Sequence, residues 1–257
     1  MHLVIGPGAM AVYGFLGALS AVGLQDIEEV SGSSAGAVLG LLVCTGKTLD
    51  EIRDIVFGVD FKELTKMNIV SFIKKFGLIP YAPIKAKLIE LCGGNLTFKD
   101  LPKKLHVTSF CMNRNVTEYF SVDNTPDMSV IDAVYMSMSI PFLFESLKYN
   151  TFTYIDGSAR ENIPSLAFLN KDPKDVLIIQ KERHKSHFDE ITNIKEFLTC
   201  IASIAVDNCV DCGSFPNMIR IDFGDANLIN FEMEYDEKMK LYLRGYQTAL
   251  IHLGSFK

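Results

Sequence analysis

Residues 30–37 read VSGSSAGA and join a short apolar run, IEEV, to the apolar stretch AGAVLGLLVCTG. Of the three serines here, only Ser34 has a glycine two residues before it and another two residues after it, at Gly32 and Gly36. Where a strand turns tightly into a helix, the side chain at the turn is pushed out of the backbone, and glycines beside it avoid a collision. The N-terminus of the following helix also favours negative charge at that point. The stretch therefore predicts either a nucleophilic Ser34 on a strand–turn–helix elbow or an ordinary turn serine.

A second glycine turn follows the first apolar run of the chain, HLVI, and reads Gly6-Pro7-Gly8-Ala9. The backbone N–H groups of such a turn can form a nest that binds an anion. The spacing matches neither the dinucleotide-binding G-x-G-x-x-G pattern nor a phosphate-binding loop. Pro7 has no N–H group, so we predict an oxyanion hole from Gly6, Gly8 and Ala9, with Gly8 and Ala9 as its main donors, together with the amide of Ala35.

A third motif, Asp156-Gly157, closes the strand-like run FTYID. An aspartate followed by glycine at a strand end is often an ordinary turn. If the fold brings Asp156 within hydrogen-bond reach of Ser34, it can instead accept the serine proton as a general base. An exposed aspartate with a pKa near 3.9 is a weak base, so this role needs burial to raise the pKa.

The order of apolar runs indicates the fold class. Two strand–turn–helix units occupy the first fifty residues, which favours an α/β fold with a mainly parallel sheet. The runs LHVTSF, VTEYFSV, FTYID, DVLIIQ and MIRIDF predict further strands. The patterns VIDAVYMSMS, IKEFLTCIASIAVDNC and EYDEKMKLYLRGYQTALIHL predict helices. Since no repeat or break in composition divides the chain, we predict one domain over residues 1–257.

Composition narrows the functional classes. A net charge of −6 disfavours a nucleic-acid binder. The six cysteines are scattered rather than spaced as a disulfide framework, which favours reduced thiols and a cytoplasmic protein. Cys209 and Cys212 have redox or zinc spacing without a second ligand pair, and no histidine has a metal-binding neighbourhood, so we expect no metal. No targeting segment or membrane span is predicted.

One segment differs in charge from the rest of the chain. Residues 62–87 contain six lysines and a single acid, Glu63, interleaved with large apolar residues. A basic and apolar segment in an acidic protein is suited to peripheral contact with an anionic membrane surface. The alternative is an amphipathic helix with a solvated lysine face.

With these motifs in this order, the chain resembles the patatin-like phospholipase family, whose members combine a glycine-rich oxyanion loop, a G-x-S-x-G serine and a D-G aspartate. SMSIPFLFES at 137–146 is similar to the family's Ser/Ala-rich segment that ends in Pro-x-x-Phe. DGSARENIP at 156–164 is similar to D-G-[GA]-x-x-x-N-x-P, and YLRGYQTAL resembles the closing helix. The oxyanion loop departs from the usual G-G-G-x-[RK]-G, because Pro7 removes a donor and Met10 replaces the basic residue.

The resemblance implies a three-layer α/β/α sandwich and a lipid acyl hydrolase of phospholipase A type. Ser34 and Asp156 would act as a catalytic dyad without a cofactor, with glycerophospholipids as substrate. Two alternatives remain open. One is a patatin-fold lipid-binding protein whose catalysis is impaired by the altered loop. The other is an α/β-hydrolase triad of Ser34, Asp156 and His252. Several strands normally precede the nucleophile in that fold, whereas only two are predicted before Ser34, which argues against the triad.

Overall fold

The computed structural model describes residues 1–182, 191–192, 197, 200–201 and 215–255. Its centre is one mixed sheet with the strand order β10-β9-β1-β2-β4-β8-β7, and β5 pairs with β4 outside this path. The strands are β1 His2–Ile5, β2 Glu29–Gly32, β4 Lys104–Cys111, β5 Val116–Phe120, β7 Leu147–Tyr149, β8 Phe152–Asp156, β9 Val176–Lys181 and β10 Met218–Ile221. β10, β9, β1, β2 and β4 run parallel, whereas β5, β7 and β8 join by antiparallel pairing. The predicted α/β class with a mainly parallel central sheet is confirmed.

Within the described residues, the structure contains four helices that the sequence patterns predict, over Val12–Val22, Ala35–Cys44, Val130–Met138 and Tyr235–Gly254, and four further ones. The helices are α1 Val12–Val22, α2 Ala35–Cys44, α3 Leu49–Gly58, α4 Phe61–Leu64, α5 Ile69–Lys75, α6 Tyr81–Cys92, α7 Val130–Met138 and α9 Tyr235–Gly254. Short 3₁₀ turns are η1 Ala9–Ala11, η2 Phe98–Asp100, η3 Gly157–Ala159, η4 Leu166–Phe168 and η5 Pro173–Asp175. Every residue of α1 from Val12 to Leu19 is buried, and nearly all of α2 is buried, because both helices are apolar all round. The predicted helix at 194–209 falls mostly outside the described residues.

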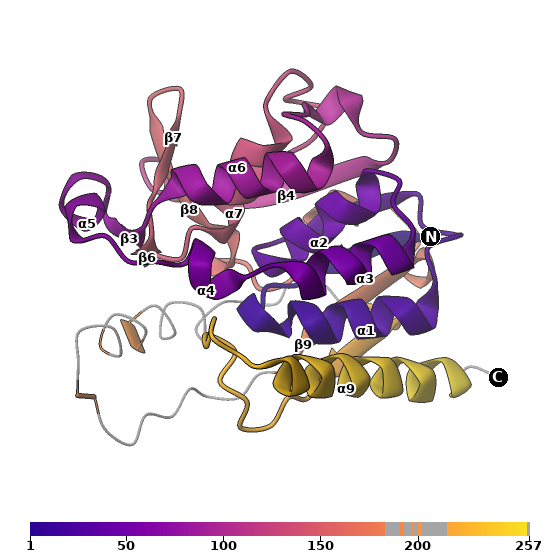
Figure 1. Cartoon of the computed structure of the whole chain (residues 1–257). Helices are drawn as coiled ribbons and strands as arrows, with labels where there is room; N and C mark the ends of the chain where they lie inside the picture. The colour runs from indigo at the N-terminus through magenta and orange to yellow at the C-terminus, as the bar shows by residue number, and fades with distance from the viewer. Residues whose placement is uncertain (183–190, 193–196, 198–199, 202–214, 256–257) are drawn as a thin grey trace.

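The helices α1 and α9 lie side by side, as Figure 1 shows, although they come from opposite ends of the chain. A Cβ at Gly17 would overlap the Tyr242 carbonyl oxygen, and one at Gly245 would overlap the Gly14 carbonyl oxygen. Glycines therefore let the two backbones approach closely, and the C-terminal helix is fixed against the first one.

The other face of the sheet carries a smaller apolar cluster. Val4, Ile163, Phe168, Val176 and Ile178 pack there under the segment that contains η4. The Ser31 hydroxyl of β2 donates to the Pro164 carbonyl at 2.6 Å, which ties this segment to the sheet. Within the described residues, the third layer of the predicted sandwich consists of this segment and its short 3₁₀ turn.

Residues 62–87 do not form the single amphipathic helix considered above. They are divided among α4, α5, the short strand β3 Gly77–Ile79 and the first half of α6. β3 pairs in parallel with β6 Phe142–Phe144 in a separate two-stranded sheet. Within the part of the chain that the structure describes, no helix combines the length and the apolarity needed to cross a bilayer.

Candidate active site

Ser34 lies on the turn between β2 and α2, with φ of 54° and ψ of −123°, a backbone conformation rare for a residue that is not glycine. A Cβ at Gly32 would lie 2.5 Å from the Gly36 carbonyl oxygen. A Cβ at Gly36 would overlap the Ile5 carbonyl oxygen at the end of β1. Both glycines are therefore required by close packing, and the turn has the predicted strand–turn–helix geometry.

Asp156 is buried at the end of β8, beside the same turn. A Cβ at Gly157 would lie 2.5 Å from Thr108 Oγ1 and 2.9 Å from Ser33 Oγ. The Asp156–Gly157 backbone thus packs directly against the residue that precedes Ser34. The fold therefore places Ser34 and Asp156, which are far apart in the sequence, next to each other.

Burial raises the pKa of Asp156 to about 6, and the nearby Ser158 and Ser34 side chains and the Ser158 amide counteract part of this rise. The Ser158 amide donates to Oδ1 at 2.8 Å. Oδ2 is buried and makes no hydrogen bond of ordinary geometry within the described residues. The Ser34 hydroxyl is thus close enough to affect the carboxyl electrostatically, but its contact falls short of an ideal hydrogen bond. This geometry leaves one carboxyl oxygen available to receive a proton.

The glycine loop after β1 requires one correction. The Gly6 amide donates to the Ile179 carbonyl oxygen at 2.9 Å and so extends the pairing of β1 with β9. Gly6 is therefore not the oxyanion donor that the sequence suggested, because its N–H group is already used. Among the described residues, the amides of Gly8, Ala9 and Ala35 make no hydrogen bond, and Ala9 has a positive φ of 47°. These three amides remain the candidate donors.

Two serines that sequence reasoning assigned no role hold the motif residues in place. The Ser34 amide donates to Ser137 Oγ at 2.9 Å. The Asp156 amide donates to the Ser139 carbonyl oxygen at 3.0 Å. Both serines belong to the segment SMSIPFLFES, at the end of α7. Their spacing carries no signal of this role, since only the fold places α7 between the turn and β8.

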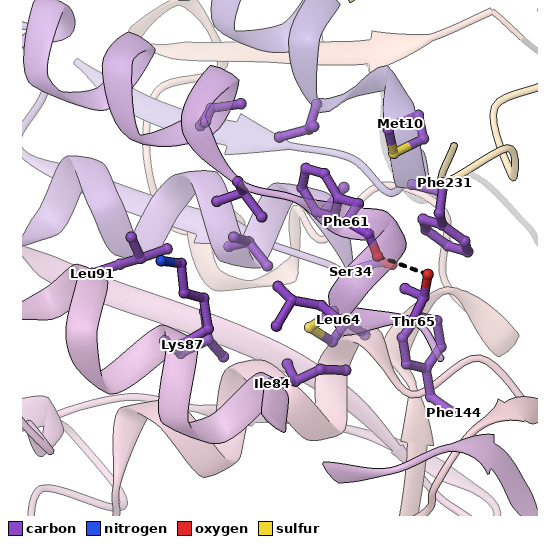
Figure 2. A pocket seen from close by; sticks show the side chains of 18 of the residues that line it. Met10, Ser34, Phe61, Leu64, Thr65, Ile84, Lys87, Leu91, Phe144 and Phe231 are labelled. Carbon is purple, nitrogen blue, oxygen red and sulfur yellow. Dashed lines mark hydrogen bonds between the residues drawn. The ribbon is translucent and has the colours of Figure 1, made fainter. Parts of the chain in front are cut away.

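An apolar pocket opens at Ser34 (Figure 2). Its volume is about 880 Å³ when the open solvent at its mouth is counted. Its walls come from the glycine loop, α2, α3, α4, α6, β6 and the segment before α9. The labelled wall residues of Figure 2 are Met10, Phe61, Leu64, Thr65, Ile84, Lys87, Leu91, Phe144 and Phe231. Met10, which replaces the basic residue of the family loop, is buried in this wall and keeps it apolar.

A family model for patatin-like phospholipases matches residues 3–169, which include the glycine loop, the Ser34 turn and Asp156. The chain belongs to the patatin-like phospholipase family. This patatin-like protein is 27% identical over 239 residues to the uncharacterized protein R571 of Acanthamoeba polyphaga mimivirus, covering 85% of this chain and 80% of that one. It is 27% identical over 190 residues to the probable lipid hydrolase 463L of invertebrate iridescent virus 6, covering 67% of this chain and 65% of the viral protein.

Among solved structures, the fold is similar to that of VipD from Legionella pneumophila, with a TM-score of 0.70 at 16% identity. The match covers 99% of this chain and 66% of VipD, so VipD is the longer protein. Membership of a patatin-like lipid hydrolase family and a mostly parallel α/β fold are therefore established for this chain.

Among the described residues of this patatin-like protein, no histidine lies beside Ser34; His184 and His187 lie outside those residues. His252 Nε2 lies 2.8 Å from Asn217 Oδ1, just before β10 begins. Because β10 and β2 run in the same direction, this is the opposite edge of the sheet from Ser34, and the α/β-hydrolase triad is excluded. His2 and His106 flank Glu29 at that same edge. Cys209 and Cys212, whose spacing was noted above, lie outside the described residues. Within the described residues, no group of three potential metal ligands is present.

Proposed function

We propose that this protein hydrolyses acyl esters of glycerophospholipids, with Ser34 as nucleophile and Asp156 as general base. Ser34 Oγ attacks the ester carbonyl carbon while the Asp156 carboxylate takes the hydroxyl proton. The amides of Gly8, Ala9 and Ala35 donate to the oxyanion of the tetrahedral intermediate. The lyso-lipid leaves with the proton from Asp156. Water, deprotonated by Asp156, then attacks the acyl-serine, and the fatty acid is released as Asp156 returns the proton to Ser34 Oγ.

The observation that carries this proposal is that the apolar pocket, Ser34 and two of the candidate oxyanion donors, Ala9 and Ala35, adjoin one another. The pocket is lined almost wholly by apolar atoms, and Ala9, Met10 and Ala35 line it together with Ser34. An acyl chain placed there gains about 0.8 kcal/mol for each buried methylene, and its ester would lie beside the serine. The proposed catalytic unit is a single domain over residues 1–257, which meets its substrate at a lipid surface through the 62–87 segment.

The test is fatty-acid release from mixed phospholipid vesicles in the presence of EDTA. Ser34→Ala and Asp156→Asn should each lower the rate by about 10³-fold or more, because nucleophile and base act as one unit. Ser33→Ala is the matched control, since this neighbouring serine is also buried and its hydroxyl has no hydrogen-bond partner in the described residues. It should retain activity close to that of the wild type.

Activity in all four proteins would refute the dyad. If the wild type binds vesicles but releases no fatty acid, the lipid-binding alternative is favoured, because Pro7 and Met10 depart from the family loop. Restoration of hydrolysis by Pro7→Gly would then assign the defect to the missing amide.

A further inference from the structure

The segment of residues 66–76, here called the α5 tip, exposes large apolar side chains that an isolated protein would normally bury. Met67, Ile69, Val70, Ile73 and Phe76 are all exposed, with Ile73 at 73% and Phe76 at 65%. The only buried residue of α5 is Ser71. Single exposed apolar residues are ordinary, whereas a cluster of this kind indicates a surface that meets another phase or another molecule.

The exposed residues form one stripe of a helix that is firmly held on its opposite side. Ile69 and Ile73 lie at i and i+4 and share one face, and the exposed Phe76 follows at the C-terminal cap of the helix with a left-handed φ of 63°. Ser71 and Lys75, also four residues apart, lie on the other face and both contact Glu145.

Glu145 is buried and anchors the α5 tip to the segment after β6. The Ser71 hydroxyl donates to it, Lys75 Nζ lies 3.1 Å away, and the Tyr81 amide donates at 3.0 Å. Although burial raises its pKa, these hydrogen bonds outweigh that effect and keep the pKa below the ordinary value. At its other end the helix is capped by Asn68, whose Oδ1 accepts from the Val70 amide at 2.9 Å. The apolar stripe is therefore presented by an ordered element.

The charges near the stripe select the kind of partner. The protein carries a net charge of −6, but the lysines at 62, 66, 74 and 75 surround the tip, with Glu63 as the only acid between residues 62 and 87. Lys74 lies on the flank of the stripe next to Val70 and makes no ion pair within the described residues. Apolar side chains flanked by lysines match the acyl and headgroup zones of an anionic bilayer.

The tip also lies beside the mouth of the pocket. Phe61, Leu64 and Thr65 of the α4 region precede the tip, Phe144 of β6 is paired with β3 after it, and all four line the pocket. In Figure 1, α5 projects beyond α4 and β6 at one end of the molecule. A bilayer in contact with α5 would therefore lie near the entrance that leads to Ser34.

We infer that the α5 tip inserts Ile69, Ile73 and Phe76 into the surface of a bilayer that contains anionic lipid, with Lys74 in the headgroup zone. The inference rests on the proposed function for its substrate, but the insertion itself can be measured without catalysis.

The chain contains no tryptophan, so a single introduced indole reports its own surroundings. Ile73→Trp should show a blue-shifted emission and quenching by brominated lipid when vesicles with anionic lipid are added. Ile251→Trp on α9 is the matched control, because Ile251 is also 73% exposed. Its emission should not change. Both measurements are made in a Ser34→Ala background, so that hydrolysis does not alter the vesicles.

A second pair of variants ties insertion to turnover. Ile73→Asp combined with Phe76→Asp should reduce vesicle binding and vesicle hydrolysis about tenfold or more, and should leave hydrolysis of a soluble short-chain ester unchanged. Lys74→Glu should weaken binding most at low salt. Lys75 is not a suitable site for this test, because it holds Glu145. Ile251→Asp serves as the control and should match the wild type.

Equal emission changes at positions 73 and 251, or none at 73 while the protein binds vesicles, would overturn the inference. A blue shift at 73 without vesicles, together with self-association in sedimentation, would show that a second copy covers the tip. If no ester is hydrolysed but the indole at 73 is still quenched, the proposed function fails and the insertion stands.

Discussion

At the scale of single residues, the central feature is a buried carboxyl group with a raised pKa beside a serine in a rare backbone conformation. Burial brings the pKa of Asp156 to about 6, which makes the carboxylate a far better proton acceptor than an exposed aspartate. The Ser158 amide and the nearby Ser34 hydroxyl oppose a further rise in the pKa, so the carboxylate form predominates at neutral pH. Ser34 is held in position by the hydrogen bond that its backbone amide donates to Ser137 Oγ.

We expect the pH dependence of hydrolysis to report this pKa. Because only the carboxylate can take the proton, kcat/KM on a soluble ester should rise about tenfold per pH unit below pH 6 and level off above it. The measurement is a pH–rate profile between pH 4 and 8. A profile that stays flat down to pH 4 would contradict Asp156 as the base.

Glu161 provides the control for this profile, because burial raises its pKa to about 7, above that of Asp156. Its Oε1 accepts from the Tyr119 hydroxyl at 2.5 Å, and its Oε2 has no partner within the described residues. Glu161→Gln should leave the rising limb near pH 6 in place. A shift of that limb in this variant would assign it to Glu161 instead.

At the scale of elements, the packing of α1 on α9 is set by glycines rather than by interlocking side chains. In an open helix, replacing glycine by alanine is favourable by about 1 kcal/mol, because alanine has the lower backbone entropy cost. At Gly245 the added methyl group would overlap the backbone of Gly14, which cannot move without displacing α1.

Gly245→Ala should therefore destabilise the protein by about 1–3 kcal/mol, as expected for overpacking. Gly254→Ala lies in the same helix, with nothing within 4 Å of the added methyl group, and should be neutral or slightly stabilising. Urea unfolding of both variants gives the two free energies of unfolding. Equal free energies of unfolding for the two variants would show that the α1–α9 packing accommodates the methyl group at Gly245 without loss of stability.

At the scale of the whole molecule, the local motifs could be predicted from the sequence and the assembled site could not. Gly32, Ser34 and Gly36 are constrained by one turn, so their spacing alone carries the geometry. Whether the Gly6 amide can serve as an oxyanion donor depends on β9, about 170 residues later in the chain, so the local motif could not predict its hydrogen bond to Ile179. Glu145 likewise anchors a helix that lies far before it in the chain.

The pocket is the main feature that arises only from the complete fold. Val38 and Leu42 lie on α2, four and eight residues after the N-cap Ser34, and all three residues line the pocket. The pocket therefore runs along α2, away from the serine. Val38 lies about 6 Å along the helix from Ser34, because each residue adds about 1.5 Å. Its side chain is placed to set how much of an acyl chain can be buried.

Val38→Phe should place a ring across the pocket and exclude the distal part of a long acyl chain. Loss of two buried methylenes costs about 1.6 kcal/mol, which lowers kcat/KM for long-chain esters about tenfold relative to a short-chain ester. Val116→Phe on β5 makes the same substitution at an exposed site away from the pocket and should leave the ratio unchanged. The ratio of kcat/KM values over a series of acyl lengths is the measurement. If Val38→Phe lowers all chain lengths equally, the acyl chain does not lie along α2.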